Sequence, residues 1–108
     1  MVFRIATLNA AQNHKCWELR RELIGGQLAE LNPDILALNE IHLPTQTGRW
    51  LQQSALAWLG SQYTLLQQSK VGADTRTETE GLLTRFPVTE TGSRDYRLQN
   101  CAAQVARF

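Results

Sequence analysis

The apolar positions at the start of the chain follow a strand, helix, strand order. Residues 1–8 are rich in apolar and β-branched side chains, which predicts a first strand ending at Asn9 and, since both of its faces are apolar, a central one. Residues 17–31 carry apolar positions with helical spacing. Pro33 cannot continue that helix, and the apolar run that follows it predicts a buried second strand over residues 35–39. This order predicts two parallel strands joined by a right-handed crossover.

The helix expected over residues 17–31 is interrupted by two adjacent glycines. Gly25 and Gly26 lie inside the apolar pattern, and each glycine costs about 1 kcal/mol relative to alanine in a helix interior, so a break or kink at this point is one expectation. Its predicted buried face comprises Trp17, Leu23, Ile24, Leu28 and Leu31.

The second part of the chain predicts antiparallel strands, because apolar runs follow one another with no helical pattern after Gly60. With two helices on one face of the sheet, the other face is expected to be either solvated or covered by something else.

Trp50 and Trp58, like Trp17, have core spacing on their helices and are expected to pack in the core rather than stack on bases. A loop is expected over 41–48, followed by a helix over 49–59 with Thr47 as its N-cap. The apolar face of this helix comprises Leu51, Ala55, Trp58 and Leu59. Strands are expected over 63–67, 80–88 and 101–108, with an exposed loop over 69–79 and a polar connection over 89–100.

Composition limits the chain to one small folded domain. It has 108 residues, of which 43% are hydrophobic, and a net charge of +1, which gives no basic stripe for nucleic acid and no attraction to an anionic membrane. Cys16 and Cys101 lack the spacing of a zinc site. A disulfide between them is one alternative, and buried or partly buried free thiols are the expected one. Neither a signal peptide nor a membrane-spanning run is visible, so the expected location is the cytoplasm.

Two polar residues come directly after the two predicted parallel strands. Asn9 follows the first strand, and Glu40 follows the second. Because parallel strands end at the same edge of a sheet, and ligands bind outside that edge, both side chains are expected to face one crevice. Taken alone, Glu40 is either a solvated acid at a strand end or the start of a site.

Three segments resemble the endonuclease/exonuclease/phosphatase superfamily, which has the deoxyribonuclease I-like fold. They are Arg-Ile-Ala-Thr-Leu-Asn at 4–9, Asn-Pro-Asp-Ile-Leu-Ala-Leu-Asn-Glu-Ile at 32–41 and Glu-Gly-Leu-Leu-Thr-Arg-Phe-Pro-Val at 80–88. The resemblance implies an α/β (α+β) fold, in which a mixed sheet with two flanking helices forms one half of a two-sheet sandwich. Residues 1–108 would then be a single partial domain, the N-terminal half of the family's domain.

The resemblance also implies a role for the two polar residues. It makes Glu40 the ligand of a divalent cation, Mg²⁺ or Mn²⁺, with Asn9 beside it, in a hydrolase acting on phosphoesters. Asn39 stands where the family usually has glutamine, and Ala11 stands where some nucleases have an acid. The family's later Gly-Asp-x-Asn and Ser-Asp-His motifs have no counterpart, so the chain alone is expected to be inactive.

Other candidates have plainer explanations. We expect Glu80 to be an acid at the rim of the crevice and Arg85 to form a surface ion pair. His14 and His42 stand in the wrong segments to replace the family's catalytic histidine. A non-catalytic module that dimerises or binds a partner through the uncovered sheet face is the alternative function, and an unrelated small α/β binding domain is a third. Which phosphoester would be the substrate is left open; nucleic acid is one of the family's substrates.

Overall fold

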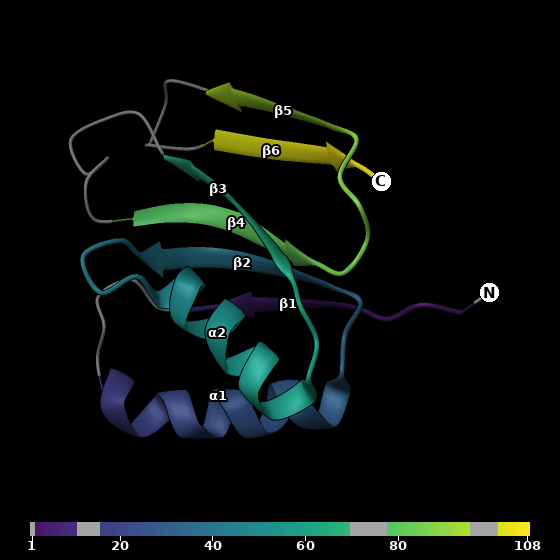
Figure 1. Ribbon diagram of the computed structural model, residues 1–108. Helices are drawn as coiled ribbons and strands as arrows, with labels where there is room; N and C mark the ends of the chain where they lie inside the picture. The colour runs from purple at the N-terminus through teal and green to yellow at the C-terminus, as the bar shows by residue number, and fades with distance from the viewer. Residues whose placement is uncertain (1, 11–15, 70–77, 96–101) are drawn as a thin grey trace.

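The computed structural model describes residues 2–10, 16–69, 78–95 and 102–108. Two helices and six strands follow one another along the chain (Figure 1). In order, they are β1 (Ile5–Asn9), α1 (Trp17–Leu31), β2 (Ile35–His42), α2 (Thr47–Leu59), β3 (Thr64–Ser69), β4 (Glu78–Thr84), β5 (Glu90–Asp95) and β6 (Ala102–Arg107).

The strands form a mixed four-stranded sheet, in the order β1-β2-β4-β3, and a β5–β6 hairpin whose β6 strand contacts β4. β1 and β2 are parallel, and the other pairs are antiparallel, which confirms the predicted strand directions. The expectation of a central first strand is wrong, because β1 lies at the edge of this sheet and, within the described residues, pairs with β2 alone. The mixed sheet with two helices confirms the predicted fold class.

One hydrophobic core lies between the sheet and the two helices, which lie on the same side of the sheet (Figure 1). The opposite face, which we call the outer face, is left open at β1, where Ile5 is 65% exposed and Thr7 and Asn9 are also exposed. The bare face expected from the sequence is therefore present at this end of the sheet. The core consists of Trp17, Ile24, Leu28, Leu36, Leu38, Ile41, Leu51, Ala55, Tyr63 and Leu83.

Helix α1 runs unbroken through its two glycines, so the break that was one expectation is absent. A Cβ atom at Gly25 would lie 2.7 Å from Cε3 of Trp58 and still closer to two other ring atoms, so this glycine lets the two helices approach. The buried face is narrower than predicted, since Leu23 and Leu31 are 72% and 56% exposed.

The three tryptophans form a row of edge-to-face contacts between the helices. Ring centroids are 5.3 Å apart for Trp17 and Trp50 and 5.8 Å apart for Trp50 and Trp58. Trp17 is buried, whereas Trp58 is 43% exposed, so the expectation of core packing holds for the first and fails for the last. Trp58 covers the α1 backbone at Gly25 instead of entering the core.

Several predicted boundaries are wrong for a common reason, namely local hydrogen bonds that the apolar pattern does not reveal. Thr47 is a fully buried residue inside α2 rather than its N-cap, which is Gln46. The Thr47 hydroxyl accepts from the backbone N–H of His42 and donates to its carbonyl oxygen, both at 2.9 Å, and β2 reaches His42. The expected loop over 41–48 is therefore shorter.

The later strands also differ from the predicted ranges. β3 begins one residue later than expected, and β4 spans residues 78–84 rather than 80–88. The polar connection expected over residues 89–100 is wrong in its first part, because β5 pairs with β6 there. The rest of that segment, Cys101 and most of the loop expected over 69–79 lie outside the described residues.

Cys16 stands at the N-cap of α1 and is exposed, contrary to the expectation of a buried thiol. Among the described residues, no helix combines the length and the apolar character needed to cross a bilayer.

Candidate functional site

β1 and β2 run in the same direction (Figure 1), and Asn9, the last residue of β1, lies beside Asn39 of β2. Asn9 is the register partner of Asn39, the residue before Glu40. The backbone N–H of Ala10 donates to the carbonyl oxygen of Asn39 at 2.8 Å, and the Arg20 side chain donates to the carbonyl oxygen of Ala10 at 3.0 Å. The end of β1 is thus held against β2 at Asn39. The prediction that Glu40 follows the second strand is wrong, because β2 continues past it to His42.

The ladder between β2 and β4 contains a β-bulge at this edge. Leu38 pairs with Gly81 and Ile41 with Thr79, so two residues of β2, Asn39 and Glu40, stand opposite the one residue Glu80. Glu40 has a φ of 54°, in the left-handed region that residues with a Cβ atom seldom adopt. The bulge is the local feature that sets the backbone direction at the candidate metal ligand.

Burial shows what the bulge does to the side chains. Leu38 and Ile41, three positions apart, are 1% and 0% exposed, although strict alternation would put them on opposite faces. The extra residue keeps both in the core. Asn39 is exposed and Glu40 half-buried. Asn39 and Glu80 help to line a hollow of about 160 Å³.

The strand register brings four residues with carboxylate or amide side chains to this edge, namely Glu40, Glu80, Asn9 and Asn39. These are ligands that hard cations accept, and Mg²⁺ commonly takes only one or two protein carboxylates while keeping several waters. Within the described ranges, no group of three or more His, Cys, Asp and Glu side chains is placed to hold a metal. The side chains at this edge are therefore of a kind that hard cations accept, although the described residues do not form a cluster of three such ligands.

Arg85 lies at the other end of the sheet. Its guanidinium is 3.3 Å from the Asp34 carboxylate and 2.9 Å from the Ser61 hydroxyl, and it also donates to the side chain of Asn32. The Asp34 carboxylate in turn accepts from the backbone N–H of Arg4 at 2.8 Å. Arg85 thus ties the start of β2 to its neighbours, in a partly buried cluster rather than the simple surface pair that we expected.

Tyr63 belongs to the same cluster. Its hydroxyl donates to the carbonyl oxygen of Pro33, and the Arg85 guanidinium lies 5.0 Å from its ring centroid. Burial raises the pKa of Tyr63 above its ordinary value of 10.0, and the negative charge of Asp34 adds to this while the positive charge of Arg85 opposes it. The cluster fixes the fold at the end of the sheet far from Glu40.

The contacts of His42 hold the turn between β2 and α2. Its Nδ1 atom is 2.7 Å from the Thr45 hydroxyl, and its backbone is bonded to Thr47. His14 lies outside the described residues, as does Ala11.

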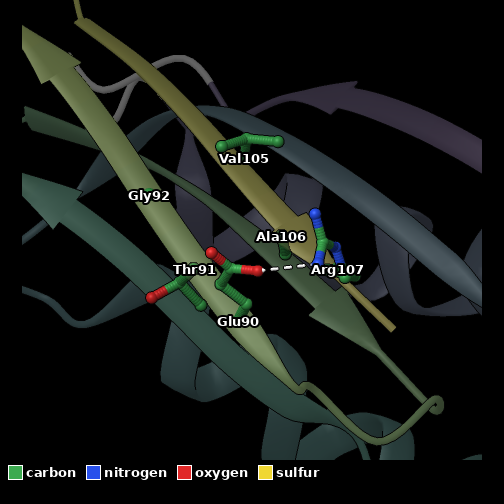
Figure 2. A pocket seen from close by; sticks show the side chains of 6 residues that line it. All are labelled: Glu90, Thr91, Gly92, Val105, Ala106 and Arg107. Carbon is green, nitrogen blue, oxygen red and sulfur yellow. Dashed lines mark ion pairs between the residues drawn. The ribbon is translucent and has the colours of Figure 1, made fainter.

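A second hollow, of about 280 Å³, lies along the hairpin of β5 and β6 (Figure 2). Glu90 and Arg107, which line it, form an ion pair with a nitrogen–oxygen distance of 3.0 Å, drawn as a dashed line in Figure 2. The carboxylate there is already balanced by a cation. The hairpin hollow therefore offers fewer groups for binding a cation than the β1–β2 edge, so we place the candidate site at that edge.

Comparison with known proteins supports the fold. No protein-family model matches the chain, and no curated protein sequence does so. Among solved structures, an endonuclease/exonuclease/phosphatase family protein from Leptotrichia buccalis C-1013-b superimposes with a TM-score of 0.72 at 14% identity. The match covers 85% of this chain and 41% of that protein. The chain therefore has an endonuclease/exonuclease/phosphatase-like fold over part of that protein's length, which confirms the resemblance seen in the sequence at the level of the fold.

Proposed function

We propose that this chain supplies the metal-binding edge of a Mg²⁺- or Mn²⁺-dependent phosphoester hydrolase, as the N-terminal half of its catalytic domain. Glu40 is the proposed cation ligand, and Asn9 supports it. The observation that carries the proposal is the parallel register of β1 and β2, which brings Asn9 beside Asn39 and next to Glu40. The cytoplasmic location predicted from the sequence stays a prediction.

The chemistry asked of these residues is limited. A bound divalent cation neutralises charge that develops on a phosphate during in-line attack. The chain's own part is to hold a carboxylate and amide oxygens at one strand edge. Hydrolysis also needs a group that orients and deprotonates water and one that assists the leaving oxygen, and the sequence motifs for these roles are absent. We therefore expect no phosphodiester hydrolysis from the chain alone in Mg²⁺.

The proposal is tested by calorimetric titration with Mn²⁺. Glu40→Gln keeps the size of the side chain and removes its charge, and we expect it to weaken Mn²⁺ binding roughly tenfold or more. Glu90→Gln is the matched control, because Glu90 is paired with Arg107 on the hairpin, and it should leave binding unchanged. Equal binding by the original chain and Glu40→Gln would overturn the proposal.

The alternative function is a non-catalytic module that binds a partner or a second copy. It is favoured by the exposed apolar side chains Ile5 and Val105, each 65% exposed, and by the open edge of β1. Sedimentation velocity tests it: a dimer that Ile5→Asp dissociates supports the alternative, with Val2→Asp, outside the strand, as the control. A monomer at high concentration counts against self-association.

A further inference from the structure

Backbone strain at the candidate site is concentrated on the acid. Among the described residues, the non-glycine residues with positive φ are Cys16, Asn32, Gln46 and Glu40. Asn32 is a helix C-cap, where left-handed backbone is common, and Cys16 and Gln46 are helix N-caps, whereas Glu40 lies inside a strand.

The order of the two bulge residues is the opposite of what stability alone would select. Asparagine tolerates left-handed backbone better than glutamate does, because its short side chain bonds locally. Yet Asn39 is outside the positive-φ set, and Glu40, the next residue, occupies the strained position. Exchanging the two would relieve strain without changing composition or charge.

The strained position also differs geometrically from its neighbour. Asn39 keeps strand pairing with β1, while Glu40 is the residue at which the register shifts before Ile41 returns to the core. A left-handed residue turns the backbone, so an acid at position 40 leaves the strand in a different direction from an acid at position 39. Strained residues of this kind gather at functional sites.

We propose that the Asn39–Glu40 bulge is a positioning device, in which the left-handed backbone of Glu40 aims its carboxylate at the cation beside Asn9. The inference rests on the proposed function and adds to it the backbone feature that sets the direction of the Glu40 side chain. Asn39 acts here through Glu40, by being the extra residue of the bulge, and is a positioning residue.

The strain is measured by urea unfolding without any metal. Glu40→Gly and Glu40→Ala both remove the carboxylate, and we expect an unfolding equilibrium constant roughly fivefold smaller for the glycine variant, since glycine accepts positive φ. At Asn39 the same pair should show the opposite order, because glycine weakens a regular strand. An alanine variant at position 40 as stable as the glycine variant would overturn the inference.

The positioning role is measured with the exchanged variant Asn39→Glu/Glu40→Asn. We expect it to unfold less readily than the original chain and to bind Mn²⁺ at least roughly tenfold more weakly, although its charge is the same. If the exchanged variant binds Mn²⁺ as tightly as the original while Glu40→Gln does not, this inference is overturned and the proposed function stands. If the original chain binds no Mn²⁺, or Glu40→Gln binds it equally well, the proposed function is overturned together with the inference.

Discussion

The contact between Gly25 of α1 and Trp58 of α2 gives the sharpest stability prediction. The two glycines of α1 are neighbours in sequence but have different surroundings: a Cβ at Gly26 meets no atom within 4 Å, whereas a Cβ at Gly25 overlaps the Trp58 ring. Replacing each glycine by alanine therefore separates intrinsic helix preference from packing, in the same helix turn.

The expected magnitudes follow from these surroundings. Gly26→Ala should stabilise the fold by about 1 kcal/mol, the helix preference of alanine over glycine. Gly25→Ala gains the same amount but forces the Trp58 ring away. Overpacking costs about 1–3 kcal/mol and a lost aromatic contact costs about 0.5–1.5 kcal/mol, so after the gain of about 1 kcal/mol the net effect is a destabilisation of about 0.5–3.5 kcal/mol. The two variants should differ in stability by about 1.5–4.5 kcal/mol.

The assay is urea unfolding followed by far-ultraviolet circular dichroism, which is insensitive to changes in tryptophan fluorescence. The same two substitutions are then made in a Trp58→Ala background, where the ring is gone. There Gly25→Ala should become stabilising, like Gly26→Ala. Equal stability of the two alanine variants with Trp58 present would refute the reasoning.

Two further predictions concern buried hydrogen bonds. Thr47→Val keeps the shape of the side chain but leaves the backbone N–H and C=O of His42 without the threonine hydroxyl, so it should cost about 1–3 kcal/mol in thermal or urea unfolding. Tyr63 has a raised pKa in the folded state, so its contribution to stability is full below about pH 10 and is lost as the pH rises through that raised pKa. The free energy of unfolding should therefore fall in the alkaline range, and Tyr63→Phe should flatten this fall; an unchanged pH profile would contradict the assignment.

The arrangement of β1, α1 and β2 could be predicted from the sequence because it follows from a clear pattern of apolar residues. The apolar runs on either side of a helix predicted the parallel pair, and the bounds of helix 17–31 agree with α1. The helix continues through Gly25 because Trp58 packs against it, and this tertiary contact has no signature in the periodicity. β5, whose sequence is Glu-Thr-Gly-Ser-Arg-Asp, has no apolar alternation and becomes a strand by pairing with β6.

The candidate site could be predicted only in part. The sequence predicted that Asn9 and Glu40 come near each other on two parallel strands, and the register places Asn9 beside Asn39, the residue before Glu40; β2 itself continues past Glu40. The bulge did not follow from it, because glutamate has no preference for positive φ and nothing else in the segment marks an extra residue. Glu80 faces the bulge across the β2–β4 ladder, a pairing that depends on the register between distant strands.

Line broadening by Mn²⁺ in nuclear magnetic resonance locates the cation directly. Asn9 and Asn39 are register partners on the parallel strands, and Asn32 lies at the opposite end of the sheet, bonded to Arg85. With a cation held by Glu40, the side-chain amide signals of Asn9 and Asn39 should broaden at low Mn²⁺ while that of Asn32 stays sharp, and Glu40→Gln should abolish the difference. Broadening of all three amides alike, or the same pattern in Glu40→Gln, would contradict a metal-binding edge at these strand ends.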